Sequence, residues 1–282
     1  MESVIYKESK GGSIQVINAA VLGSPISHSL SPRLHMSAYK HLNISGKYGS
    51  FDVPAGSLGE FLSDKTKDWT GFSLTMPLKE EVLSVAEVID PLVKRIQSGN
   101  TLIRQGNSWS LHSTDVLGFQ NAWYKENSSK PKTVLIVGSG ATARAAAAAF
   151  DDAKTSISVL HRNSEREASM HASVNTATMK FLPWQFTNDF YESDLVINTT
   201  PKAVLDSFAH ELSHKPNGTF FDVIYNPWPT QFASAWTNAG SPVISGLDLL
   251  IAQGIEQIRL FTGIDIDREE LSTFLKRELS AN

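Results

Sequence analysis

The chain of 282 residues is about twice the length of a common domain, so its length favours two domains over one. Hydrophobic residues make up 41% and charged residues 19%, which excludes a disordered chain. The 25 basic and 29 acidic side chains leave a net charge of −4, which gives no support to a nucleic-acid or membrane-surface partner. The absence of cysteine excludes disulfides, thiolate nucleophiles and cysteine-ligated metal sites.

The N-terminal residues lack the apolar core and the cleavage site of a signal peptide. No later stretch approaches the roughly 18 apolar residues that span a bilayer. We therefore expect a soluble, cytoplasmic protein, and the lack of cysteine is compatible with a reducing compartment.

The first half of the chain alternates short apolar runs with helix-like segments. Residues 14–22, 48–53 and 69–75 predict strands, and Ser31 followed by Pro32 predicts a helix whose N-cap is Ser31. This alternation favours an α/β sheet with parallel strands.

A second pattern begins after the polar, turn-forming stretch 125–132. Residues 133–137 form a fully apolar run that is typical of a strand buried on both faces. Further strands are predicted at 157–160, 179–182, 195–198, 220–224 and 242–245. Six strands with helical stretches between them match a doubly wound dinucleotide-binding fold. An amphipathic helix at 247–260 and another from residue 268 close the chain.

Directly after the apolar run comes Gly138-x-Gly140-x-x-Ala143. Glycines between a strand and a helix let the backbone approach a pyrophosphate, whose charge the helix N-terminus stabilises. The alternative is a tight strand–helix turn without a ligand.

The end of the second strand of this half bears on the choice of cofactor. An NAD site usually carries an acid there, whereas this chain reads His161-Arg-Asn-Ser-Glu-Arg166. Arg162, with Arg166, is placed to bind a ribose 2′-phosphate. A solvated basic loop is the alternative, and together with the glycine turn the pattern favours NADP.

Polar groups also gather at turns of the first half. Ser27 and Ser29 precede a helix N-terminus, where an anionic carboxylate is stabilised. Lys79 occupies a first helical turn, where a cation opposes the helix dipole and a purely structural lysine is poorly placed. The alternatives are that Lys79 projects into water and that Asp115 is only an N-cap.

Several motifs occur in the order typical of one family. They include G-x-P-I-x-H-S-x-S-P-x-x-H at 23–35, T-x-P-x-K at 75–79 and N-T at 100–101, with further matches at 113–115, 161–166, 222–227 and 246–254. In these segments, from about residue 21 to about residue 262, the chain resembles the shikimate dehydrogenases. That resemblance implies an N-terminal α/β substrate-binding domain (14–117 with 247–282) and a Rossmann-type NADP-binding domain (118–246), with the active site in the cleft between them.

The resemblance also implies a reaction and its residues. The reaction is reduction of 3-dehydroshikimate by NADPH, with Lys79 and Asp115 as the catalytic pair, in a monomer or a homodimer. Ser27 and Ser29 are implied to bind the carboxylate, and the ring hydroxyls are assigned to Thr75, Lys79, Asn100, Asp115 and Gln253, with Tyr225 nearby. The residues implied to bind NADP are Gly138, Ser139, Gly140, Ala141, Arg162, Asn163, Arg166, Thr200, Val223 and Gly246.

The chain departs from the family pattern at positions that carry no proposed catalytic group. These are Met36, Ser113, Val116, Ala141 and the pair Lys202-Ala203, which stands where Gly-Met is common. They leave open a broader enzyme that also uses quinate or another cofactor. A catalytically silent NADP-binding sensor is the other alternative.

One further pattern, His210-Glu211-x-x-His214, fits the zinc-protease helix signature. Residues 215–218 include a proline and a glycine that end any helix, and no third ligand follows. We therefore expect a surface helix there and no metal.

Overall fold

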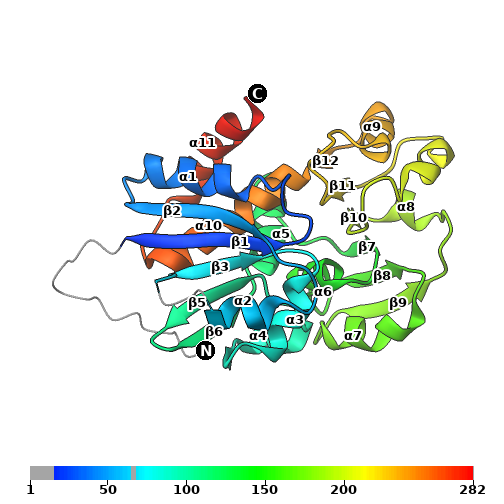
Figure 1. Ribbon diagram of the computed structural model, residues 1–282. Coiled ribbons are helices and arrows are strands. Elements are labelled where there is room, and N and C mark those ends of the chain that lie inside the picture. Colours follow the sequence, from blue (N-terminus) through cyan, green and yellow to red (C-terminus); the bar gives the residue numbers. More distant parts are fainter. Residues whose placement is uncertain (1–15, 65–67, 282) are drawn as a thin grey trace.

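The computed structural model describes residues 16–64 and 68–281 as two β-sheets with helices packed against them (Figure 1). Both sheets have six strands. The predicted strand at 14–22 runs over Ile17–Gly23, and residues 14 and 15 lie outside the described part of the chain.

The first sheet has the strand order β2-β1-β3-β5-β6-β4. Its strands are β1 Ile17–Gly23, β2 Gly46–Asp52, β3 Gly71–Leu74, β4 Val88–Ile89, β5 Thr101–Gln105 and β6 Ser108–His112. Strand β1 pairs in parallel with β2 and β3, but β5 runs antiparallel to both β3 and β6. The expectation of parallel strands is therefore wrong for β5. Only Gly106 and Asn107 separate β5 from β6, and so short a connection can join only antiparallel strands.

In the described part of the first half, the α-helices are α1 Ser31–His41, α2 Leu58–Asp64, α3 Leu78–Glu81, α4 Pro91–Ile96 and α5 Asp115–Tyr124. A short 3-10 helix, η1, follows α3 at Val82–Ser84. Helix α1 has Leu30 as its N-cap, so the prediction that Ser31 is the N-cap is wrong by one position. The reason is local, since the Ser29 hydroxyl accepts the backbone N–H of Ser31 at 3.3 Å.

The second sheet has the order β12-β11-β10-β7-β8-β9, and every pair in it is parallel. Its strands are β7 Thr133–Val137, β8 Ser156–Leu160, β9 Thr178–Leu182, β10 Leu195–Asn198, β11 Thr219–Asp222 and β12 Val243–Ile244. Helices α6 Ala141–Ala149, α7 Glu167–Ala172, α8 Asp189–Glu192 and α9 Gln231–Asn238 connect them, with 3-10 helices η2 Ser164–Arg166 and η3 Asp206–Glu211. The predicted doubly wound sheet of six strands is confirmed.

The C-terminal helices α10 Gly246–Thr262 and α11 Arg268–Ser280 return to the first sheet (Figure 1). A capping box of Ser245 and Asp248 starts α10. Ile255 and Phe261 of α10 share an apolar cluster with Ile17 of β1 and Leu34 of α1. This packing brings the last part of the chain beside the first.

The zinc-protease pattern does not form the helix that its signature requires. Helix η3 ends at Glu211, Leu212 is extended, and His214 instead stacks on Tyr191 with ring centroids 3.7 Å apart. Within residues 16–64 and 68–281, no group of three or more histidine, cysteine or acidic side chains is arranged to hold a metal ion. Among the helices of the same ranges, none is long and apolar enough to cross a membrane.

Candidate active site

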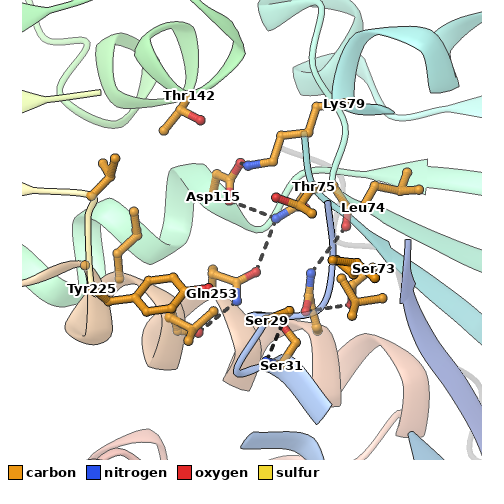
Figure 2. Close-up of a pocket in the computed structure, with 18 of the residues that line it drawn as sticks. Ser29, Ser31, Ser73, Leu74, Thr75, Lys79, Asp115, Thr142, Tyr225 and Gln253 are labelled. Carbon is orange, nitrogen blue, oxygen red and sulfur yellow. Dashed lines mark hydrogen bonds and ion pairs between the residues drawn. The ribbon is translucent and has the colours of Figure 1, made fainter. Parts of the chain in front are cut away.

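Lys79 and Asp115 form an ion pair where α3 and α5 begin (Figure 2). The Lys79 Nζ lies 2.5 Å from Asp115 Oδ2, and the two side chains are 16% and 6% exposed. The alternative that Lys79 projects into water is therefore wrong. Asp115 is also more than an N-cap, because Thr114 holds that position and Asp115 is the first helical residue.

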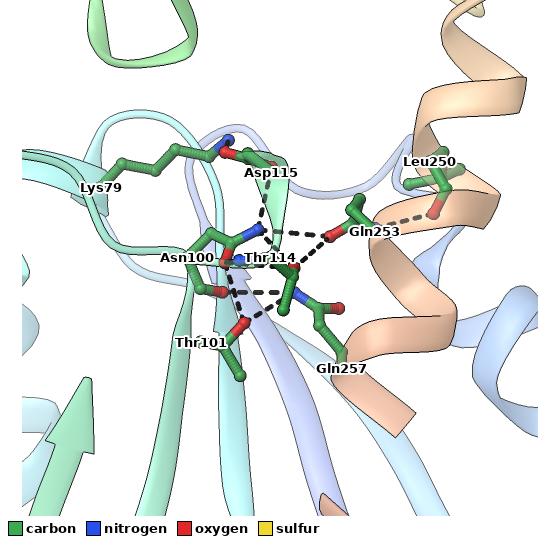
Figure 3. Close-up of polar contacts among 8 residues, drawn as sticks. All are labelled: Lys79, Asn100, Thr101, Thr114, Asp115, Leu250, Gln253 and Gln257. Atoms are coloured by element: carbon green, nitrogen blue, oxygen red, sulfur yellow. Dashed lines mark hydrogen bonds and ion pairs between the residues drawn. The ribbon is translucent and has the colours of Figure 1, made fainter. Parts of the chain in front are cut away.

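Asn100, directly before β5, donates to the other oxygen of the same carboxylate (Figure 3). Its Nδ2 donates to Asp115 Oδ1 at 2.9 Å, and its Oδ1 accepts the backbone N–H of Thr114 at 2.8 Å. Both carboxylate oxygens of Asp115 are thus occupied, one by Lys79 and one by Asn100. This fixes the rotation of the carboxylate and the place of the ammonium group.

Gln253 reaches this cluster from α10. Its Nε2 donates to the Leu250 carbonyl at 2.8 Å, so its Oε1 faces Asn100 Nδ2 and Thr114 Oγ1, each at 3.4 Å. Helix α5 allows this close approach at Gly118, where an added Cβ would lie 2.9 Å from Gln253 Cβ. The C-terminal helix therefore completes a site that the first sheet begins.

These side chains line a cavity of about 300 Å³ (Figure 2). Among the residues expected at the site, its walls include Ser29, Thr75, Lys79, Asn100, Asp115, Val223, Tyr225, Gly246 and Gln253. Ser27 is exposed and lines neither this cavity nor the neighbouring one.

Five polar residues of this wall were not expected from the sequence: His28, Ser31, Ser73, Thr142 and Gln257. Two of them could have been recognised from features of the sequence. Ser73 is a hydroxyl inside an otherwise apolar buried strand, and Gln257 lies one helical turn after Gln253 on the same face.

Tyr225 is held at the wall by the loop that follows β11. The carboxylate of Asp222 accepts the Ile224 backbone N–H at 3.1 Å and the Thr230 hydroxyl at 2.8 Å. Burial raises the pKa of Asp222, although these hydrogen bonds act against the rise. Burial likewise raises the pKa of Tyr225, against a hydrogen bond with the backbone of Leu30. The phenol therefore stays neutral at physiological pH.

A second cavity of about 630 Å³ adjoins the first, because Thr75, Lys79 and Thr142 line both. Its walls include the expected residues Gly138, Ser139, Gly140, Ala141, Arg162, Asn163, Arg166 and Thr200. Gly138 has φ of 109°, and an added Cβ would lie 2.5 Å from Thr199 Oγ1, so this turn requires glycine. Val223 and Gly246 line the first cavity, at its boundary with the second sheet.

Arg162 lies over the ring of Trp184, with the guanidinium carbon 4.7 Å from the ring centroid. Trp184 also lines the second cavity, and the sequence did not point to it. The cation–π contact holds Arg162 beside Arg166 at this wall. The backbone turn and two cations fit a dinucleotide that carries an extra phosphate.

Of the positions where the chain departs from the family pattern, only Ala141 lines either cavity. Met36 is exposed on α1 and Val116 is buried in the core. The Ser113 hydroxyl is buried without a hydrogen-bond partner in the described residues. Ala203 has φ of 67°, a region that favours glycine.

The fold and the site together define a two-domain α/β protein in which a dinucleotide-type cavity meets a smaller polar pocket at a lysine–carboxylate pair. Residues 21–102 match the family model of the shikimate dehydrogenase substrate binding domain. A shikimate dehydrogenase (NADP(+)) of Methanococcoides burtonii is 34% identical over 251 residues, 86% of this chain and 91% of that protein. One from Bacillus cereus is 30% identical over 271 residues, 92% and 97% of the two chains. The chain belongs to the shikimate dehydrogenase family.

Solved structures agree with this assignment. The shikimate dehydrogenase of Mycobacterium tuberculosis is 32% identical with a TM-score of 0.80, over 93% of this chain and 99% of that one. The enzyme of Thermus thermophilus, in complex with NADP(H) and shikimate, is 28% identical with a TM-score of 0.80, over 93% and 100% of the chains. A 5-ketofructose reductase of Gluconobacter, at 21% identity, shares the fold.

Proposed function

We propose that this protein is an NADP-dependent shikimate dehydrogenase, which reduces 3-dehydroshikimate reversibly to shikimate in aromatic amino-acid biosynthesis. The observation that carries this proposal is the Lys79–Asp115 pair, which lies where the two cavities meet. The curated relatives carry the same name, and the Thermus thermophilus structure contains NADP(H) and shikimate.

We assign the larger cavity to the cofactor and residues 118–246 to its domain. The backbone turn at 138–141 would hold the pyrophosphate, and Arg162 with Arg166 would bind the 2′-phosphate. Asn163 and Thr200 complete the wall of this cavity. Val223 and Gly246, which line the smaller cavity beside the second sheet, would contact the cofactor from there. When bound, NADPH supplies the hydride.

The smaller cavity is assigned to the substrate, in a domain formed by residues 14–117 and 247–282. Ser29, with Ser27 at the exposed edge of the same loop, would bind the carboxylate. The ring hydroxyls would contact Thr75, Lys79, Asn100, Asp115 and Gln253, with Tyr225 nearby, since these groups offer donors and acceptors to the cavity.

Lys79 moves the proton in this proposal. Its ammonium group gives a proton to the carbonyl oxygen as that oxygen becomes a hydroxyl, and in the reverse direction the amine takes the proton back. Asp115 holds the ammonium group 2.5 Å away, and Asn100 keeps the carboxylate from turning. Positioned proton transfer of this kind contributes about 10²- to 10⁴-fold to a rate.

Initial rates with shikimate and quinate, each with NADP and NAD, test the function. We expect the highest kcat/KM for shikimate with NADP. Faster turnover of quinate or with NAD would favour the broader enzyme. Intact NADP binding without turnover of either acid would favour the sensor. The cytoplasmic location and the monomer or homodimer stay predictions.

A further inference from the structure

Beneath the Lys79–Asp115 pair, buried polar side chains form a continuous row of hydrogen bonds across the base of the smaller cavity. From the pair outward the row is Asn100, Thr101, Gln257, Ser73 and Tyr48, and its members are at most 6% exposed. The hydrogen bonds within it measure 2.6 to 3.2 Å. The row joins β2, β3 and β5 to α10.

The direction of each hydrogen bond near the ion pair follows from chemistry. A carboxylate only accepts, so Asn100 must present its Nδ2 to Asp115. The Oδ1 of Asn100 then faces the other way and accepts the Thr101 hydroxyl at 2.9 Å, together with the Thr114 backbone N–H. The Thr101 proton is thereby used, so Thr101 can only accept from its next neighbour, Gln257 (Figure 3).

A second group that can only accept a hydrogen bond determines which atoms donate and which accept farther along the row. The backbone carbonyl of Asn100 only accepts, so the Gln257 Nε2 must face it at 3.3 Å, as well as Thr101 Oγ1 at 3.2 Å. The Gln257 Oε1 therefore accepts from Ser73 at 2.8 Å. Because the single Ser73 proton is used there, Tyr48 must donate to Ser73 at 2.6 Å.

The hydrogen bond between His35 and Gln257 is consistent with this assignment of donors and acceptors. Its Nε2 lies 3.3 Å from Gln257 Oε1 and must donate to it, while its Nδ1 is buried with no partner among the described residues. The ring stacks on Tyr48 with centroids 3.8 Å apart. Burial lowers the pKa of His35 to about 3, so the ring is neutral and carries its one proton on Nε2.

We infer that Thr101 and Gln257 are positioning residues for the proposed reaction: they hold the side-chain amide of Asn100 in the one orientation that supports Asp115 and, through it, Lys79. This inference rests on the proposed function. Thr101 is fully buried and does not line the cavity, so it acts only through its neighbours. A hydroxyl at this position matters because it donates to Asn100 and accepts from Gln257 at once.

Steady-state kinetics of Thr101→Val in the full chain test the inference. The substitution keeps the shape of the side chain and removes the hydroxyl, so we expect kcat to fall about tenfold or more while the KM for shikimate changes less than about threefold. Thr101→Ser restores the hydroxyl and should keep kcat within about threefold of the original. A loss confined to KM, or an unchanged kcat, would overturn the inference.

Thr155→Val is the matched control. Thr155 is 3% exposed, and its hydroxyl donates to the Pro131 carbonyl at 2.9 Å in the second domain. The Thr155→Val variant loses a buried hydroxyl hydrogen bond of the same kind, but far from the site, so its kcat should stay unchanged. An equal fall in kcat would mean that Thr101 contributes only general stability and would overturn the inference.

Two further measurements separate this inference from the function itself. Gln257→Met should reproduce the fall in kcat even if Thr101→Val does not fold, and normal kcat in Gln257→Met would count against the row. A crystal structure of either variant needs no turnover: we expect the hydrogen bond from Asn100 to Asp115 to be lost or lengthened. Its retention at about 2.9 Å with Lys79 unmoved would overturn the inference. Absence of turnover in the unmodified protein would overturn the proposed function alone.

Discussion

The guanidinium of Arg144, on α6, lies 2.5 Å from the carboxylate of Glu80, the residue that follows Lys79. Arg144 is buried and also donates to the carbonyls of Ile96 and Gln97 at the end of α4, at 2.7 and 2.9 Å. Helix α6 begins at the glycine turn of the larger cavity. One side chain therefore ties the assigned cofactor domain to the turn that carries Lys79.

Arg144→Leu should lower the free energy of unfolding by about 2 kcal/mol, because it leaves two helix-end carbonyls and Glu80 without their donor. Urea denaturation measures this. Lys130→Met is the control: its ion pair with Asp152 is exposed, so the loss of that pair should lower the free energy of unfolding far less than Arg144→Leu does. A similar decrease in the free energy of unfolding for the two variants would contradict the bridging role of Arg144.

Lys79→Ala should lower kcat by about 10²- to 10⁴-fold, since it removes the proposed proton donor. The KM for shikimate should change far less. Steady-state kinetics with shikimate and NADP measure both constants, with Lys130→Ala as a control for the loss of an unrelated lysine. A loss confined to substrate affinity would refute proton transfer by Lys79.

Arg162→Ala should raise the KM for NADP by about tenfold or more, because a charge-assisted contact with the 2′-phosphate is lost, and should change the KM for NAD little. The comparison of the two cofactors in one variant is the measurement. Trp184→Leu removes only the ring beneath Arg162 and should have a smaller effect in the same direction. Equal losses for NADP and NAD would count against the phosphate contact.

His35 should make stability depend on pH. Its pKa is about 3 in the folded chain and 6.5 in the unfolded chain, so the unfolded state takes up the proton first as the pH falls. The contribution of neutral His35 to the free energy of unfolding is complete above pH 6.5. As the pH falls from there to about 3, this contribution is lost progressively, by at most about 1.4 kcal/mol per pH unit.

Urea denaturation between pH 7 and pH 5 checks this, and the His35→Leu variant should show a flatter dependence of unfolding free energy on pH. Tyr39→Phe is its control, because the Tyr39 hydroxyl is buried without a partner in the described residues and burial raises its pKa out of this range. An unchanged slope in His35→Leu would exclude His35 as its source.

Local sequence accounts for much of the second domain. The apolar run 133–137, the glycine turn and the basic segment after β8 are consecutive features, and each sets its own backbone or charge within a few residues. These features predicted the doubly wound sheet and part of the wall of the larger cavity, namely the glycine turn with Arg162 and Arg166. The ordered motifs of the first half similarly indicated Lys79, Asp115 and the family.

The sequence alone thus predicted two domains, a doubly wound sheet and most of the residues proposed for the site, among them Lys79 and Asp115. Only the tertiary structure decided that β5 pairs antiparallel with β3, that Trp184 lies under Arg162 and that Ser27 is exposed. It also decided that Gln257 contacts a residue 157 positions away, Asn100. Periodicity shows which face of a helix or strand is buried, but not which distant segment covers it. A buried serine or glutamine therefore appears in the sequence as an exception to the pattern, and the folded chain alone identifies its hydrogen-bond partner.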